Sequence, residues 1–382
     1  MYTVFEHIVM KSEIEQILIK KIDREGKIPF SSFMDIALFH ESYGYYNTCD
    51  IFGGKGDFIT SPITSSLFGE SLANEFINIL ENKKNQSILE IGGGDGSLAL
   101  SIMKYLNKTN HLPSSYIILE SSAQLIEVQK KKIKQKIPEL FNFFIWKTKL
   151  DVDKFDGLVI ANEFFDAIPT ERFKFINNNY EKLYIIFDDN FKYIWQQGDD
   201  CLNKNIDIAL KGKNITLTQN YISEINVNYN TWLKKLNNAM NSGIIFIIDY
   251  GYNASEYFLK DRSEGTLVCI NNHQSNFNPL KNIGKQDISS FVNFSYLASL
   301  ASENNFLVDG YLSQSSFLLN LGILNIYDNK EYDSNQKIIE LNKLKNILLP
   351  NTMGEIFKVL VLKKNINKNL ISTKEFNKIE KL

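Results

Sequence analysis

The sequence predicts an α/β protein built on a doubly wound, mostly parallel β-sheet. From residue 87 onward, short apolar runs alternate with amphipathic helical stretches, and the run Ile88–Ile91 leads directly into a glycine-rich turn and a helix. Apolar strands that alternate with helices are typical of parallel sheets, whose two faces are both covered by helices. The 382 residues can bury such a core, in one large domain or in two smaller ones.

Composition and charge exclude several classes of protein. Lys plus Arg total 42 and Asp plus Glu total 44, so the basic excess typical of nucleic-acid-binding proteins is absent. No apolar run approaches the roughly 18 residues of a membrane span, and the N-terminus lacks the apolar core of a secretory signal. The three cysteines are sparse, and the four histidines are not at metal-ligand spacing. We therefore expect a cytoplasmic protein without disulfides, a metal centre or an integral membrane segment.

Residues 1–80 are predicted to form an N-terminal helical segment. Apolar residues at spacings of three and four indicate helices over 12–38 and around 67–80. Between these helices lies a turn-rich aromatic stretch that contains the glycine-rich residues 53–60, which lack the Gly-Lys-Ser/Thr ending of a phosphate-binding loop. Spacing alone is consistent both with a lid over a ligand and with a plain surface turn.

Residues 81–169 are predicted to form the cofactor-binding half of the sheet. Short apolar runs mark its strands at 87–91, 116–119, 141–146 and 158–161. Helical periodicity near 97–106 and 122–136 separates the first three strands.

The parallel pattern stops after Pro169. We expect 170–240 to be an inserted α+β subdomain, with antiparallel strands that turn at 177–179 and 188–190. The second half of the core, 241–362, resumes the pattern and carries a further insertion at 252–305. Its strands are expected at 243–249, 307–312 and 355–362. The two insertions would form a substrate-facing subdomain, and residues 363–382 a polar tail that is mobile or a loose helix.

The first expected strand runs into the turn Glu90-Ile91-Gly92-Gly93-Gly94-Asp95-Gly96. Glycines tolerate positive φ angles and let a ligand approach the backbone, and the N-terminus of the next helix offers free N–H groups. The spacing E-x-G-x-G-x-G differs from the dinucleotide fingerprint G-x-G-x-x-G, which disfavours an NAD-dependent oxidoreductase. S-adenosylmethionine carries no phosphate, and an acidic residue suits its cationic amino end. We therefore predict S-adenosylmethionine as the cofactor, held by Glu90, Gly92, Gly94 and Gly96.

A second carboxylate, Glu120, follows the next expected strand. In nucleotide-binding folds, an acidic residue about 20 residues beyond the glycines accepts hydrogen bonds from the ribose hydroxyls. We predict this role for Glu120. The alternative is a tight glycine turn without a ligand and a Glu120 that merely caps a helix.

Polar residues follow two further strands at the edge where open α/β sheets bind their ligands. The string Asn162-Glu163-Phe164-Phe165-Asp166-Ala167-Ile168-Pro169 follows one of them. We predict that Asn162, Glu163 and Asp166 orient a cationic or amide-bearing acceptor, although a helix cap flanked by core phenylalanines fits the string too. Asp249 and Tyr250 end the strand beginning at 243, and they fit either an acceptor-pocket lining or a solvated turn.

These motifs, in this order, resemble the MidA-like family of S-adenosylmethionine-dependent methyltransferases, which is linked to assembly of respiratory complex I. The resemblance covers about residues 28–362. The string from Asn162 to Pro169 and the string Gly56-Asp57-Phe58-Ile59-Thr60 carry it most specifically. It also includes His40 to Tyr46, Ser61-Pro62, Phe68-Gly69, Ile248 to Tyr252, Gly265-Thr266-Leu267, Gln286-Asp287-Ile288, and Gly354 with Phe357 to Leu360.

The resemblance implies a class I, Rossmann-like methyltransferase sheet of seven strands and dimethylation of an arginine in a complex I core subunit. It also implies that Gly56, Asp57 and Phe58 belong to the cofactor pocket, and that the acidic string faces the reaction. Guanidinium stays protonated in water, so a carboxylate pair is needed to orient it; Glu163 and Asp166 are the candidates.

Three positions depart from the family pattern. Gly93 replaces the usual proline of the glycine loop, Ile63 replaces an acidic residue, and Ile270 lies where an aromatic is expected. These changes spare the cofactor motif and leave the acceptor specificity open. An assembly chaperone that binds S-adenosylmethionine and a protein partner without turnover is the alternative function. The sequence leaves open whether the protein is a monomer or a homodimer.

Overall fold

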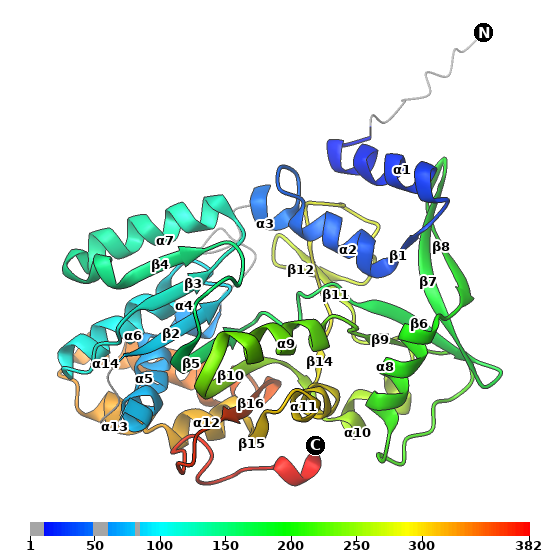
Figure 1. Cartoon of the computed structure of the whole chain (residues 1–382). Coiled ribbons are helices and arrows are strands. Elements are labelled where there is room, and N and C mark those ends of the chain that lie inside the picture. Colours follow the sequence, from blue (N-terminus) through cyan, green and yellow to red (C-terminus); the bar gives the residue numbers. More distant parts are fainter. Residues whose placement is uncertain (1–10, 49–59, 81–84) are drawn as a thin grey trace.

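The computed structural model describes residues 11–48, 60–80 and 85–382. Its centre is an eight-stranded sheet (Figure 1). The main path through this sheet is β15 (Leu307–Ser313), β16 (Phe357–Lys364), β10 (Met240–Tyr252), β5 (Phe155–Asn162), β2 (Gln86–Ile91), β3 (Tyr116–Leu119) and β4 (Phe144–Lys147). Within this sheet β16 runs antiparallel to β10 and β15. The short β14 (Val292–Asn293) pairs with the end of β10 and adds one strand to the seven that the resemblance implies. The predicted mostly parallel α/β fold is confirmed.

Alternating side chains of the core strands enter two hydrophobic clusters on opposite faces of the sheet. In β5, Leu158 and Ile160 face one cluster, whereas Val159 and Ala161 face the other. All four side chains are fully buried. A strand that is apolar on both faces needs helices on both faces, and the helices of this chain provide them.

One face is covered by α5 (Ser66–Leu80), α6 (Ser97–Lys108), α7 (Ala123–Lys136), α12 (Gln314–Asn320), α13 (Ile323–Asp328) and α14 (Ser334–Leu348). The short helices α4 (Ser61–Thr64) and α15 (Met353–Ile356) lie beside them. The other face is covered by α8 (Asp200–Leu210), α9 (Tyr229–Ala239), α10 (Ala254–Tyr257) and α11 (Phe294–Glu303).

The segment after Pro169 forms antiparallel strands, as the sequence predicts, and a short N-terminal strand joins them in a second sheet. It contains β1 (Ile28–Pro29), β7 (Asn179–Asp188), β6 (Glu171–Ile176) and β9 (Tyr221–Ile225), with β8 (Asn190–Gln197) paired to β7. Both predicted turns are present, because Asn177, Asn178 and Asp189 adopt the positive φ angles that tight hairpins require. A third, small sheet contains β11 (Val268–Asn271), β12 (Gln274–Asn276) and β13 (Asp287–Ser289).

The predicted helix over residues 12–38 is wrong in one respect, because it is two helices. A capping box formed by Ser12 and Glu15 starts α1 (Glu13–Glu25), and Gly26 ends it with a φ of 77°. The chain then pairs as β1 with β7 before α2 (Phe30–Phe39) begins. Both helices pack on the second sheet and share a hydrophobic cluster with it, and the short α3 (Tyr45–Thr48) follows. Figure 1 shows α1 and α2 beside the second sheet and apart from α5 and α6.

Two other predictions differ from the structure. The first half of the expected strand at 141–146 belongs to a 3-10 helix, η1 (Pro138–Phe143), which Pro138 starts, and only the second half belongs to β4. The C-terminal residues are also held in place: the carboxylate of Glu75 accepts hydrogen bonds from the backbone N–H groups of Ile371 and Ser372. Two short 3-10 helices, η2 (Lys260–Arg262) and η3 (Ile379–Lys381), complete the elements. Among the helices in the described part of the chain, none combines the length and apolarity that crossing a membrane requires.

Candidate active site

A cavity of about 1020 Å³ lies at the carboxyl ends of β2, β3 and β5. The core sheet supplies one wall through the glycine loop, Glu120 and the acidic string. Residues of α2 and α9 complete the lining. Its lining includes Ser31, Ser32, Asp35, Tyr46, Thr60, Pro62, Ile63, Glu90, Gly92, Gly93, Gly94, Asp95, Glu120, Asn162, Glu163, Phe164, Pro169, Asn228, Trp232 and Lys235.

The glycine loop has the backbone that its sequence predicts. The φ angles of Gly92, Gly94 and Gly96 are 73°, 52° and 79°, a region that side chains with a Cβ rarely adopt. Gly92 and Gly94 line the cavity. Gly96 does not line the cavity and is the N-cap residue of α6.

Glu90 projects from the end of β2 into the buried side of the cavity. Its carboxylate accepts a hydrogen bond of 2.7 Å from the Tyr116 hydroxyl. Burial raises the pKa of Glu90 to about 8, and the nearby carboxylates of Asp95 and Glu120 add to the effect. No Lys or Arg side chain in the described residues pairs with Glu90, so a cationic ligand amine would provide its missing counter-charge.

Glu120 is buried at the end of β3 and also lines the cavity. One carboxylate oxygen accepts a hydrogen bond of 3.0 Å from the Ser122 backbone N–H, and the other accepts one of 3.4 Å from the Gln129 side chain. Burial raises the pKa of Glu120, and these hydrogen bonds oppose that rise. The capping role and the ribose-binding role are compatible, because a carboxylate has about four acceptor positions.

Glu163 lines the cavity directly after β5 and has a φ of 52°, an uncommon backbone conformation for a residue with a side chain. Such conformations concentrate at functional sites. The Asn162 side chain donates a hydrogen bond of 3.2 Å to the Glu163 carboxylate. Burial, reinforced by the charge of Asp166, raises the pKa of Glu163 to about 8.

Asp249 lies beneath the acidic string and does not line the cavity. Its Oδ2 atom accepts hydrogen bonds from the backbone N–H groups of Phe164, Phe165 and Asp166, at 3.2, 2.8 and 3.2 Å. Asp249 therefore holds the loop that carries Glu163. Tyr250 is also outside the cavity, with its ring 4.0 Å from that of Phe357.

Asp166 lies next to Asp249, is partly buried, and does not line the cavity either. Burial and the neighbouring charges of Asp249 and Asp287 hold its pKa well above the usual range. Among the described residues, one of its oxygens, Oδ1, has no hydrogen-bond partner, and the same holds for Oδ1 of Asn162. Buried polar atoms of this kind call for a ligand or a water as partner.

The sequence analysis assigned no role to Tyr46 and Asp287, which adjoin this cluster. Tyr46 lines the cavity and donates a hydrogen bond of 3.0 Å to Asp287 Oδ1. Ser289 donates one of 2.5 Å to the other oxygen. Both residues lie in sequence strings that carry the family resemblance. The sequence therefore marked these two positions but did not indicate what their side chains do.

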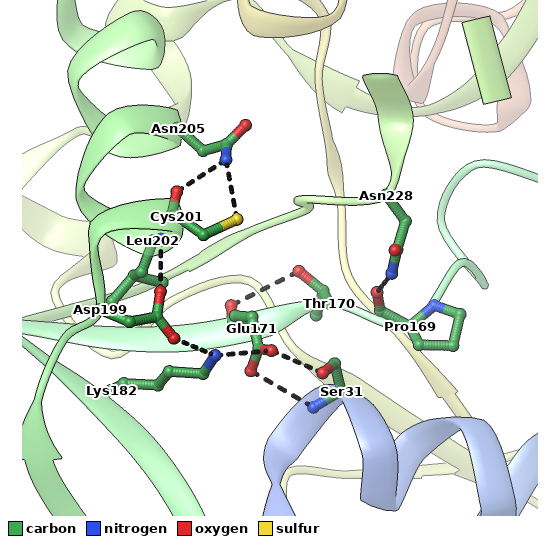
Figure 2. Close-up of polar contacts among 10 residues, drawn as sticks. All are labelled: Ser31, Pro169, Thr170, Glu171, Lys182, Asp199, Cys201, Leu202, Asn205 and Asn228. Atoms are coloured by element: carbon green, nitrogen blue, oxygen red, sulfur yellow. Dashed lines mark hydrogen bonds and ion pairs between the residues drawn. The ribbon is translucent and has the colours of Figure 1, made fainter. Parts of the chain in front are cut away.

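The part of the lining that α2 forms depends on contacts between residues that are distant in sequence. Ser31 at the start of α2 donates a hydrogen bond of 2.6 Å to Glu171. Lys182 bridges Glu171 and Asp199 at 3.1 and 3.0 Å, and Asp199 caps α8 (Figure 2). This network ties α2 to the second sheet.

A second contact of this kind joins two other lining residues. The Asn228 side chain donates a hydrogen bond of 3.0 Å to the Pro169 carbonyl (Figure 2). Both residues line the cavity. The sequence contains no local signal for either contact.

Lys132, at the lysine-rich end of α7, contacts the glycine loop and the start of α6. Its Nζ lies 2.6 Å from Asp95 Oδ2 and 2.7 Å from the Ser97 hydroxyl. The predicted pocket residues Gly56, Asp57 and Phe58 lie outside the described residues, although Thr60, Pro62 and Ile63 line the cavity. Within the described ranges, no group of three or more His, Cys, Asp or Glu side chains has a geometry that could hold a metal ion.

Comparison with known families agrees with this geometry. Residues 69–312 match the model of Methyltransf_28, a family of S-adenosyl-L-methionine-dependent methyltransferases. The chain belongs to this family. The cofactor of this methyltransferase is therefore S-adenosylmethionine, and the fit of the site agrees: glycines at positive φ and the buried carboxylates of Glu90 and Glu120 line the same cavity.

Individual relatives extend the comparison over most of the chain. A crystal structure from Burkholderia thailandensis with bound S-adenosyl-homocysteine has a TM-score of 0.90 and 26% identity, and the match covers 97% of this chain and 96% of that chain. A Caenorhabditis elegans protein named protein arginine methyltransferase NDUFAF7 homolog, mitochondrial, is 26% identical over 82% of this chain and 77% of its own length. The Homo sapiens protein arginine methyltransferase NDUFAF7, mitochondrial, is 26% identical over 90% of this chain and 82% of its own length.

These names correct one expectation. The sequence analysis predicted a cytoplasmic protein, and the comparison contradicts it, because both curated relatives are named as mitochondrial.

Proposed function

We propose that this methyltransferase modifies an arginine side chain of a protein. The observation that carries the proposal is an acidic group without a basic partner: Glu163 lines the cavity, with Asp166 and the buried Asp249 behind it, and in the described part of the chain no Lys or Arg forms an ion pair with any of the three. Burying carboxylates without a counter-charge is costly. A guanidinium that enters beside them would relieve this cost.

The chemistry follows from the properties of the arginine side chain. Bound S-adenosylmethionine supplies an electrophilic methyl group. Guanidinium is protonated in water, so the site must orient one nitrogen and accept its proton as the new N–C bond forms. Glu163 is the group that would do both, since it lines the cavity and its raised pKa, about 8, makes its ionised form a stronger base than an ordinary carboxylate.

Asn162 and Asp166 would support Glu163 in this reaction. The free Oδ1 of Asn162 is an acceptor for a guanidinium N–H. Asp166 adds a second carboxylate behind Glu163, and its own free Oδ1 gives the cation a further partner when the side chains adjust. Glu90, Gly92, Gly94, Gly96 and Glu120 would hold the cofactor at the other end of the cavity.

The names of the curated relatives support arginine as the acceptor. From the family resemblance, we further propose that the acceptor belongs to a core subunit of respiratory complex I. In this proposal the insertions 170–240 and 252–305, together with the N-terminal helices, receive the substrate protein, because α2 and α9 contribute residues to the cavity lining.

Single-turnover methyl transfer to the candidate complex I subunit tests the proposal. Glu163→Gln and Asp166→Asn should each lose methyl transfer by roughly a hundredfold or more, since misplaced reactants cost about that much. Affinity for S-adenosyl-homocysteine should stay within about twofold of the wild type. Normal turnover in both variants would refute the acceptor site. A wild type that binds partner and cofactor without methylating anything would favour the assembly-chaperone function instead.

A further inference from the structure

Helix α7 contributes a buried side chain that links the two halves of the cofactor site. Gln129 is fully buried, although it lies on a helix that is otherwise largely polar. Its Nε2 atom donates hydrogen bonds of 2.9 Å to the Gly94 carbonyl and 3.4 Å to Glu120 Oε2. One amide group thus connects the glycine loop to the carboxylate expected to bind the ribose.

The orientation of this amide is determined by a third contact. Gln129 Oε1 accepts a hydrogen bond of 3.0 Å from the Trp146 indole. An indole N–H can only donate, so the amide oxygen must face Trp146 and the NH2 group must face Gly94 and Glu120. The Gly94 carbonyl and the Glu120 carboxylate are both acceptors, so each hydrogen bond of the amide pairs a donor with an acceptor.

The absence of a side chain at Gly93 makes room for this arrangement. A Cβ atom at Gly93 would lie 2.9 Å from Gln129 Nε2 and 2.6 Å from Ile118 Cγ2, which is closer than real Cβ contacts come. A peptide bond points its C=O and N–H in opposite directions. Anchoring the Gly94 carbonyl on α7 therefore directs the N–H of Asp95 away from α7.

We propose that Gln129 is a positioning residue for the cofactor, because its NH2 group holds the glycine loop and Glu120 at a fixed separation. The cofactor must bridge these two elements, with its amino-acid end near the loop and its ribose at Glu120. Lys132, one turn further along the same face of α7, holds Asp95 and reinforces this clamp. The inference concerns cofactor binding alone and holds whatever the acceptor is.

Titration calorimetry with S-adenosyl-homocysteine, without any acceptor, tests the inference in three variants. Gln129→Glu keeps the shape of the side chain but places an ionised oxygen against two acceptors. At pH 8.5 its affinity should fall at least tenfold below the wild type. At pH 5.5 the introduced carboxyl regains a proton and can donate again, so the ratio to wild type should fall to about threefold or less. Gln135→Glu, on the exposed face of the same helix, should stay within about twofold at both pH values.

Gln129→Met provides the second variant, with similar volume and no donor. It should bind about tenfold more weakly at both pH values, with circular dichroism and melting temperature showing that it folds. Affinity within twofold of wild type in a folded Gln129→Met protein would overturn the inference, as would a Gln129→Glu defect that is the same at both pH values. A wild type that does not bind S-adenosyl-homocysteine would contradict the cofactor assignment and this inference with it, whereas the arginine proposal is tested only by methyl transfer.

Discussion

Asp249 Oδ2 lies 2.8 Å from the backbone nitrogen of Phe165. This one oxygen accepts hydrogen bonds from three consecutive backbone N–H groups, of which that of Phe165 is the middle one. The loop after β5 is thereby bound to the end of β10, the strand beside it in the sheet. Glu163 lies in this loop and also donates its N–H to the Ile248 carbonyl. The position of the proposed catalytic carboxylate therefore depends on a second carboxylate that does not contact the cavity.

Asp249→Asn should destabilise the protein and slow methyl transfer together. The other oxygen, Oδ1, accepts a hydrogen bond of 2.9 Å from the Tyr250 N–H, so both oxygens of Asp249 face donors. The asparagine amide has one oxygen and one NH2 group, so either the three N–H groups at Oδ2 or the Tyr250 N–H at Oδ1 would lose the acceptor. This loss should lower the free energy of unfolding by about 1–3 kcal/mol. Denaturant unfolding measures this loss. Equal stability of Asp249→Asn and the wild type would mean that the three contacts do not hold the loop.

Gly94→Val should abolish binding of S-adenosyl-homocysteine. Gly94 lines the cavity with a φ of 52°, where a β-branched side chain is strained and occupies space that the ligand needs. Gly212→Val is the matched control, since Gly212 has a φ of 72° and open space around it. Calorimetry should find normal affinity for the control; a folded Gly94→Val protein with unchanged affinity would exclude the loop as the cofactor site.

Glu120→Gln should weaken S-adenosyl-homocysteine binding by about 1–3 kcal/mol, because the ribose hydroxyls lose a charged acceptor. Glu127→Gln on the exposed side of α7 controls for the change in net charge. If Glu120 serves only as a cap for the Ser122 N–H, the melting temperature falls while affinity changes less than about twofold.

Stability should decrease as pH rises from about 5 to about 8. In the folded protein Glu163 has a pKa of about 8, above its ordinary value of 4.5. Between these values the folded state holds more protons than the unfolded chain, so the free energy of unfolding falls with rising pH. Glu163→Gln removes this contribution, and its melting temperature should fall less steeply over that range than that of the wild type.

Burial also raises the pKa values of Glu90 and Asp249 to about 8. Both residues remain in the Glu163→Gln variant, so its melting temperature should still fall somewhat with rising pH. Glu127→Gln should leave the slope unchanged. Parallel melting curves for Glu163→Gln and wild type over this pH range would show that Glu163 is ionised in the folded protein.

The core strands and the cofactor loop could be predicted from the sequence because their signals are local. The strand predicted at 116–119 has the same bounds in the structure, since its four apolar residues are bordered by polar ones. The loop from Gly92 to Gly96 requires its glycines for backbone reasons alone. The hairpins of the second sheet were equally local, because asparagine and aspartate favour the positive φ angles of their turns.

The remaining features depend on contacts between distant residues. Asp249 was predicted at the correct edge of the sheet, but only the neighbouring loop determines that its side chain turns inward. Gln129 and Lys132 are ordinary residues on a polar helix until β4 and the glycine loop are placed beside them. Likewise, Ser31 becomes part of the cavity wall only through Glu171, on the second sheet.

The most direct test of the account is mass spectrometry of methylated proteins from cells with and without this gene, complemented by wild type or by Glu163→Gln. The account predicts a methylated arginine on a protein substrate that is present with the wild type and absent from both the deletion and the Glu163→Gln cells. Loss of methylation only at lysine or another residue type would contradict it, and so would an arginine mark that persists with Glu163→Gln.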